Sequence, residues 1–259
     1  MKNFLTYRIC LLIILLPGCT RDHLTGQQDQ LIQATIWFQH SAEMRALYYQ
    51  SYNWAGRELE RKVSEGSEKP WAVVLDIDET VLDNSPQTAQ QIVDGEPFTD
   101  AMWDEWCSLA QAQPLPGALD FTKSAAGKGV ELFYISNRGN HLLGVTLQNL
   151  RAAGFPFADS SHVLLKTSTS VKDPRIEKVK ETHEIALLIG DNLGDFSGMF
   201  DERSDGLVKE RVDEKRDLFG TTFFLLPNPM YGSWEKPFRG EFPEETRSLK
   251  KEQLRTYRH

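Results

Sequence analysis

Two aspartates one residue apart follow a short apolar run, where reactive groups would stand at the end of a buried strand. The run 71–75 is rich in valine and stops at Asp76 and Asp78. Such a run predicts a strand buried on both faces, which in an α/β protein is a central parallel strand whose carboxyl end borders the ligand. Two carboxylates this close favour a divalent ion with oxygen ligands, of which Mg²⁺ is the simplest choice. The alternative is that the pair only caps the following turn.

Three further strand-like runs also end in polar residues. The run 130–135 ends in a hydroxyl, an amide and a cation, which together suit the oxygens of a phosphate group. The run 162–165 ends in a lysine, and the run 185–189 ends in a glycine-containing loop with two acidic residues. These polar residues are Ser136, Asn137 and Arg138, then Lys166, then Asp191 and Asp195.

In this order the four strand ends resemble the motifs of the haloacid dehalogenase-like superfamily of phosphotransferases. Two motifs are closer still to the bacterial class C acid phosphatases, lipoproteins that include 5′-nucleotidases: Asp76-Ile77-Asp78-Glu79-Thr80-Val81-Leu82-x-Asn84 and Gly190-Asp191-Asn192-Leu193-x-Asp195-Phe196. The resemblance extends to residues 37–43 and covers most of the chain. It implies a Rossmann-like α/β fold with a central parallel sheet, a small helical cap and an added N-terminal helix. One departure is Gln87, where the family usually has Tyr, and it bears on the preferred leaving group.

The resemblance implies a metal-dependent phosphomonoesterase. Asp76 would be the nucleophile that forms an aspartyl-phosphate, and Asp78 would be the general acid and base. Mg²⁺ would be held by Asp76, the backbone carbonyl of Asp78, and Asp191. A dehalogenase of the same superfamily would lack the acid/base Asp78 and the acidic pair that begins at Asp191.

Phosphate would be held by three residues in the resemblance: Ser136, Asn137 and Lys166. Asp195 would orient either Lys166 or a water molecule on the metal. Further along the chain, Lys172 and Arg175 fall on a segment expected to be helical over 167–181. These two charges are predicted to be solvated, with phosphate contact as the alternative.

Aromatic residues could line a slot for a leaving group. A cap-like insertion at about 84–113 interrupts the alternation of strands and helices and contains Trp103. The resemblance suggests Trp103 as one wall for a nucleobase or aryl group and Tyr231 as the other. The alternative is that these rings fill a small core.

The N-terminus is typical of an exported bacterial lipoprotein. Residues 1–18 carry two cations before an apolar run too short to span a bilayer, and Cys19 follows. Cys19 would then be lipidated, with palmitate among its acyl chains, and Thr20 rather than Asp beside it favours the outer membrane of the cell envelope. Pro17 is unusual in such a signal and leaves ordinary secretion as the alternative. Residues 19–28 are expected to tether the lipid to the domain.

Residues 29–259 are expected to form one domain, with its core at about 69–230 and a helix over 31–63 before it. Cys107 is the only cysteine left in this part, which excludes an intramolecular disulfide. Without a histidine nearby in sequence, Cys107 is predicted to be a buried, inert thiol rather than a nucleophile.

The formal net charge is −8, and it becomes −10 once Lys2 and Arg8 leave with the signal peptide. This charge excludes nucleic acid as a natural partner. Small phosphomonoesters are the expected substrates: nucleoside monophosphates, nicotinamide mononucleotide or aryl phosphates. A homodimer is a further expectation from the resemblance. The rival interpretation is a surface lipoprotein that binds a nucleotide or haem without turnover.

Overall fold

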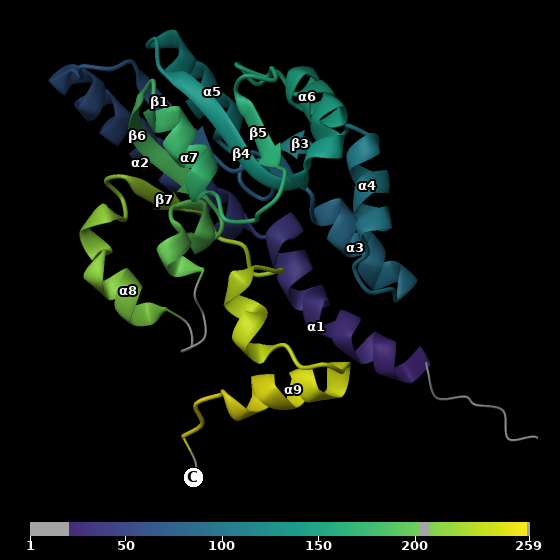
Figure 1. The fold of residues 1–259 in the computed structure, drawn as a ribbon. Coiled ribbons are helices and arrows are strands. Elements are labelled where there is room, and N and C mark those ends of the chain that lie inside the picture. The colour runs from purple at the N-terminus through teal and green to yellow at the C-terminus, as the bar shows by residue number, and fades with distance from the viewer. Residues whose placement is uncertain (1–20, 202–207, 258–259) are drawn as a thin grey trace, which may run out of the picture.

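A five-stranded parallel sheet forms the centre of the molecule (Figure 1). The computed structural model describes residues 21–201 and 208–257. The strand order is β5-β4-β1-β6-β7, which places the predicted strand 71–75 in the middle as β1. The strands are β1 Trp71–Leu75, β4 Glu131–Gly139, β5 Val163–Lys166, β6 Glu184–Gly190 and β7 Phe223–Leu225. The expected α/β fold with a central parallel sheet is confirmed.

Helices cover both faces of this sheet. On one face Val73 and Leu75 of β1 pack in the larger hydrophobic core, whereas Ala72 and Val74 face the second core on the other side. This alternation follows from the two-residue period of a strand, and it explains why β1 is apolar throughout. The first core includes residues of α2 Ala42–Glu65, α5 Ala118–Gly127 and α6 Leu143–Ala152, and the second includes residues of α7 Asp173–Lys180.

The N-terminal helical region is divided in two. A single helix over 31–63 was predicted, but α1 (Arg21–His40) ends before Ser41 and α2 begins after it. Ser41 has extended backbone angles, and its Oγ accepts a hydrogen bond from Met44 N at 3.0 Å, so it caps α2. The predicted tether overlaps α1, which is helical from Arg21 onward. The predicted lipidation site, Cys19, lies outside the described residues.

Helix α2 supports the loop that follows β1. The buried hydroxyl of Tyr48 donates to the carbonyl oxygen of Glu79, and that of Tyr52 donates to the carbonyl oxygen of Thr80 at 2.8 Å. Glu79 has a positive φ of 54°, a conformation that is uncommon for residues other than glycine. The two tyrosines therefore hold a tight turn beside Asp76 and Asp78.

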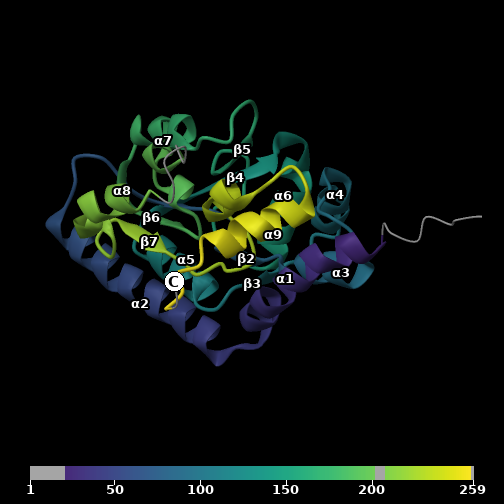
Figure 2. The same cartoon turned by 90° about the horizontal axis from the view of Figure 1, so that it is seen from below.

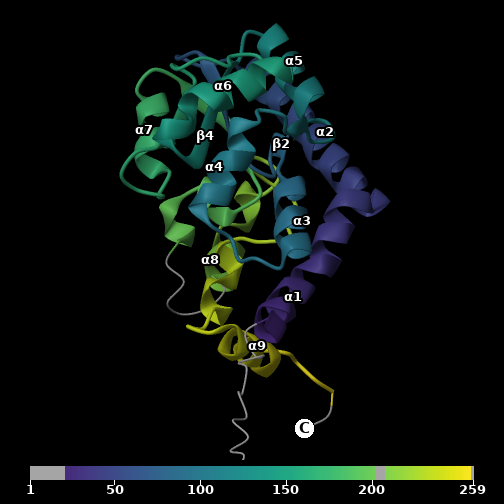
Figure 3. The ribbon, with the colours of Figure 1, turned by 90° about the vertical axis from the view of Figure 1, so that its right-hand side faces the viewer.

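The segment predicted as a cap is a small helical insertion. Strands β2 Leu82–Asp83 and β3 Gln113–Pro114 pair antiparallel at its base. Between them lie α3 Ser85–Asp94 and α4 Asp100–Ser108, which contact each other beside the sheet (Figure 3). Cys107 on α4 is free and buried, and burial raises the pKa of its thiol to about 12, as expected for an inert thiol.

The C-terminal region returns to the N-terminal helix. Figure 2 shows α9 (Pro243–Glu252) beside α1, and the two helices contact each other. Helix α8 (Lys209–Glu214) precedes β7. Within the described ranges, none of the helices combines the length and hydrophobicity that crossing a membrane requires.

Candidate active site

The carboxyl edge of the sheet borders a cavity of about 1280 Å³. The loops after β1, β4, β5 and β6 all contribute to its wall, as parallel topology requires. The cavity is lined by most of the residues predicted for the site, namely Asp76, Asp78, Trp103, Asn137, Lys166, Asp191, Asp195 and Tyr231. Ser136 is buried and does not line the cavity.

Three carboxylates converge in the wall of this cavity. Asp76, Asp191 and Asp195 each place one oxygen so that the three atoms lie within 4.8 Å of one another. Asp76 and Asp195 are buried, and the Oδ2 of Asp191 accepts a hydrogen bond from Asn228 Nδ2 at 2.9 Å. A set of hard anionic oxygens at this spacing fits a divalent ion such as Mg²⁺.

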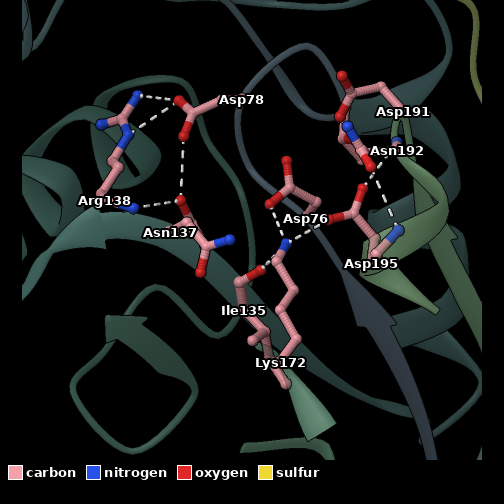
Figure 4. Close-up of polar contacts among 12 residues, drawn as sticks. Asp76, Asp78, Ile135, Asn137, Arg138, Lys172, Asp191, Asn192 and Asp195 are labelled. Carbon is pink, nitrogen blue, oxygen red and sulfur yellow. Dashed lines mark hydrogen bonds and ion pairs between the residues drawn. The ribbon is translucent and has the colours of Figure 1, made fainter. Parts of the chain in front are cut away.

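The cation within the carboxylate cluster is Lys172 (Figure 4). Its Nζ is paired with Asp76 Oδ1, lies 2.8 Å from Asp195 Oδ1, and also donates to the carbonyl oxygen of Ile135. Only 2% of its side chain is exposed, so the prediction that Lys172 is a solvated helix charge is wrong. The reason is the pair of buried carboxylates, which compensates the cost of burying an ammonium group.

Lys166 lies on the wall of the cavity, but it is not the partner of Asp195 that one of the two predictions for Asp195 expected. Its side chain is exposed on the cavity wall, and the structure gives Asp195 to Lys172 as an ion-pair partner instead. The Oδ2 atom of Asp195 accepts a hydrogen bond from the backbone N–H of Asn192 at 2.9 Å. Within the cluster, Lys172 therefore links Asp195 to Asp76.

Asp78 faces a second cation, Arg138 (Figure 4). Arg138 donates from Nε and Nη2 to Asp78 Oδ1 at 2.9 and 2.8 Å, and Ser136 Oγ donates to Asp78 Oδ2 at 3.0 Å. Burial lowers the pKa of Arg138, but the ion pair with Asp78 outweighs this and the net shift is upward. Arg138 and Ser136 were predicted to suit phosphate oxygens, and the structure places both on Asp78 instead.

Helix α4 of the cap insertion is connected to Asp78 through the side chain of Asn84. Asn84 Nδ2 donates to Asp78 Oδ1 at 2.8 Å, and Trp106 Nε1 donates to Asn84 Oδ1 at 2.8 Å. The ring of Trp103 lies 5.5 Å from the guanidinium of Arg138, within cation–π range. Thus α4 contacts two of the three residues that hold Asp78, namely Asn84 and Arg138.

Arg175 was also predicted to be a solvated charge, but it is half-buried and braces the C-terminal part of β4. It donates to the carbonyl oxygen of Ser136 at 2.6 Å and to Asn137 Oδ1 at 2.7 Å. Burial lowers its pKa, while the nearby carboxylates Asp76 and Asp195 act in the opposite direction. Asn137 is exposed and reaches the cavity, so Arg175 fixes a residue that a ligand can touch.

Burial also changes the acidity of the carboxylates. It raises the pKa of Asp76 from 3.8 to about 7, with Lys172 opposing the shift and the charges of Asp195 and Asp78 adding to it. The pKa of Asp191 is raised for the same reasons, burial first and then the charges of Asp195 and Asp76. Without a metal ion, the cluster therefore holds protons that the unfolded chain would release.

We expect the stability of the metal-free protein to fall as the pH rises from about 5 to about 7.5. The folded pKa of Asp76 lies above its unfolded value, so the native state binds more protons across this window and loses stability as they dissociate. Melting temperatures in EDTA would drop by several degrees, and saturating Mg²⁺ would reduce the drop. Asp76→Asn should flatten the profile, and a melting temperature that rises across the window in EDTA would contradict the prediction.

Comparison with known proteins supports one family. The family model described as HAD superfamily, subfamily IIIB (acid phosphatase) matches residues 22–234. The solved class C acid phosphatase of Bacillus anthracis is 38% identical, with a TM-score of 0.83 over 90% of this chain and 99% of that one. A structure of the class C acid phosphatase from Bacillus anthracis with tungstate bound is 39% identical, with the same TM-score and the same coverage.

Two plant proteins are more distant relatives. Stem 31 kDa glycoprotein of Glycine max is 26% identical over 218 residues, which span 82% of this chain and 72% of that protein. Acid phosphatase 1 of Solanum lycopersicum is 26% identical over 186 residues, spanning 67% of this chain and 64% of that protein. The chain therefore belongs to subfamily IIIB of the haloacid dehalogenase superfamily and is a phosphoric monoester hydrolase of the acid phosphatase type.

Proposed function

We propose that this acid phosphatase is magnesium-dependent and acts through an aspartyl-phosphate on small phosphomonoesters. The observation that carries the proposal is the convergence of Asp76, Asp191 and Asp195 at the carboxyl edge of the sheet, with Lys172 buried among them. A nucleophile, a set of ion ligands and a charge-balancing cation are what phosphoryl transfer requires of a protein.

In this mechanism Asp76 attacks the phosphorus atom in line with the departing oxygen. Lys172 orients the Asp76 carboxylate and offsets its repulsion of an incoming phosphate dianion, and Asp195 keeps Lys172 in place. Asp76, Asp191 and the backbone carbonyl of Asp78 would hold Mg²⁺, which supplies positive charge to the phosphate oxygens.

The departing oxygen needs a proton, and Asp78 is the group we assign to deliver it. Asp78 then takes a proton from the water that hydrolyses the aspartyl-phosphate. Arg138, Ser136 and Asn84 position its carboxylate at the cavity wall. Asn137 and Lys166, both exposed to the cavity, are the proposed contacts for the remaining phosphate oxygens.

The size of the cavity supports leaving groups as large as a nucleoside. Trp103 and Tyr231 both line it and offer flat apolar surfaces for a base or an aryl ring. Nucleoside monophosphates, nicotinamide mononucleotide and aryl phosphates are therefore the proposed substrates. The tungstate complex of the Bacillus anthracis relative is consistent with the phosphate group that these substrates share, since tungstate is a tetrahedral oxyanion like phosphate.

We also propose that the protein is a lipoprotein of the bacterial cell envelope, anchored in the outer membrane through lipidated Cys19. The support is the sequence pattern of residues 1–19, with Lys2 and Arg8 before an apolar run. A homodimer in solution is the corresponding proposal for assembly, and it rests on the family resemblance.

Phosphate release by residues 20–259 tests the proposed activity. The substrates are nicotinamide mononucleotide, AMP and p-nitrophenyl phosphate, each with Mg²⁺ and with EDTA. We expect turnover with Mg²⁺ and a loss of about 100-fold or more in EDTA that added Mg²⁺ restores. No release from any of the three by folded, magnesium-loaded protein would refute the proposal and favour a lipoprotein that binds its ligand without turnover.

A further inference from the structure

Gln87 on α3 leaves a buried hydrogen-bond donor without a partner at the wall of the cavity. Its side chain is 6% exposed and its residue lines the cavity. The Oε1 atom accepts a hydrogen bond from Gln91 Nε2 at 2.7 Å, but Nε2 of Gln87 has no partner in the part of the chain that the structure describes.

This unpaired donor differs from the other buried polar atoms without partners. Across residues 21–201 and 208–257 those are Thr35 Oγ1, Trp71 Nε1 and Glu79 Oε2, and none of their residues lines the cavity. Nearly all buried polar groups in proteins are paired, so an exception calls for a cause. Pairing with Gln91 uses only the oxygen of the Gln87 amide, and an acceptor for the nitrogen can arrive from the cavity with a ligand.

The position of Gln87 also says which part of a ligand it would meet. Its backbone N–H donates to the carbonyl oxygen of Asn84 at 2.9 Å, so it lies one helical turn beyond the residue that contacts Asp78. Asp78 is assigned to the departing oxygen, which places Gln87 beside the leaving group rather than the phosphate. Phe98 and Trp103 of the same insertion line the same cavity, with ring centroids 6.3 Å apart.

We propose that Gln87 is a specificity-determining residue whose amide nitrogen donates a hydrogen bond to an oxygen or nitrogen acceptor on the leaving group. The amide turns its donor toward the cavity when such a ligand is bound. The preferred substrates are then phosphomonoesters with polar, nucleoside-like leaving groups, and plain aryl esters are poorer ones. The inference rests on the proposed phosphomonoesterase function and adds the class of leaving group.

The test compares Gln87→Met with Gln91→Met in the magnesium-loaded protein, with AMP and phenyl phosphate as substrates. Both variants lose the hydrogen bond between the two glutamines, but only Gln87→Met loses the unpaired donor. We expect Gln87→Met to lower the ratio of kcat/KM for AMP over phenyl phosphate about tenfold, and Gln91→Met to change it less than about threefold. Inhibition by adenosine should weaken in parallel in Gln87→Met.

Each outcome has a distinct meaning. If the wild-type protein hydrolyses neither AMP nor phenyl phosphate, the proposed phosphatase function is refuted, and the role of Gln87 that rests on it is refuted with it. If wild type is active and the ratio is unchanged in Gln87→Met, or falls equally in both variants, the role of Gln87 is refuted. Melting temperatures verify folding, and Gln87→Leu replaces Gln87→Met if the methionine variant does not fold.

Discussion

Replacing Asp76 with Asn should abolish phosphate release from every substrate, with kcat lowered by about 10⁴-fold or more. An amide of the same shape cannot attack phosphorus, and it also removes one anionic oxygen from the cluster with Asp191 and Asp195. Initial rates with saturating Mg²⁺ measure the loss. Asp83→Asn is the matched control, because Asp83 accepts a hydrogen bond from Ser85 N in the same region but lies outside the cluster.

The covalent intermediate can be observed directly. Acid quenching of wild type during turnover of a phosphate-labelled ester should leave label on the protein that hydroxylamine removes, as expected for an acyl phosphate. Asp76→Asn should carry none, and Asp83→Asn should resemble wild type. Retention of more than about a tenth of the wild-type rate by folded Asp76→Asn would rule out Asp76 as the nucleophile.

Lys172→Met should damage both stability and activity. Removing the ammonium leaves the Asp76 and Asp195 carboxylates buried without their cation, and breaking a buried pair in this way costs about 3–5 kcal/mol. Lys172 is also the strongest influence that holds the pKa of Asp76 down, so its loss keeps the nucleophile protonated to higher pH. We expect urea unfolding at lower denaturant concentration and a fall in kcat of about 100-fold.

Lys166→Met is the control for this experiment. Lys166 is exposed on the cavity wall, so its replacement should leave urea unfolding unchanged and mainly raise KM, by about tenfold or less. Both variants are compared at a temperature at which each is folded. A greater loss of kcat in Lys166→Met than in Lys172→Met would reverse the assignment of the two lysines.

The parts of the fold that the sequence predicted depend on local patterns. The apolar run 71–75 marked a strand buried on both faces, and the polar residues directly after the strands marked the edge where the site lies. In parallel topology these strand ends share one edge of the sheet, and the family resemblance then implied that Asp76 and Asp191 lie together there, as they do. The insertion at about 84–113 was visible because it broke the alternation of strands and helices.

The pairing of charges could not be predicted in the same way. Lys172 and Asp76 are 96 residues apart, and Arg138 and Asp78 are 60 apart. Whether a lysine is solvated or buried depends on which carboxylates the fold brings to it, and a helical pattern does not contain that information. Lys166 directly follows a predicted strand, whereas Lys172 lies in a polar segment. Looking for site residues directly after strands therefore selected Lys166, although the lysine that pairs with Asp195 is Lys172.

The division of the predicted helix at Ser41 was not predicted, for a different reason. Serine is tolerated within a helix and favoured at its start, so the sequence between 31 and 63 was compatible with one helix or two. The structure starts a new helix there, and this directs α2 along the sheet, where Tyr48 and Tyr52 meet the loop after β1. The start of a new helix at Ser41 thus determines whether Tyr48 and Tyr52 can contact the loop after β1.

The contacts of this loop and those of Asp191 come from opposite directions along the chain. The tyrosines of α2 precede the turn at Glu79 that they hold. Asn228, the amide partner of Asp191, is made 37 residues after it and follows the last strand of the sheet. The turn after β1 is therefore held by residues that precede it, whereas Asp76 and Asp191 depend on Lys172 and Asn228, which follow later in the chain, so losing the segment around Asn228 would free Asp191 and leave the support of the turn in place.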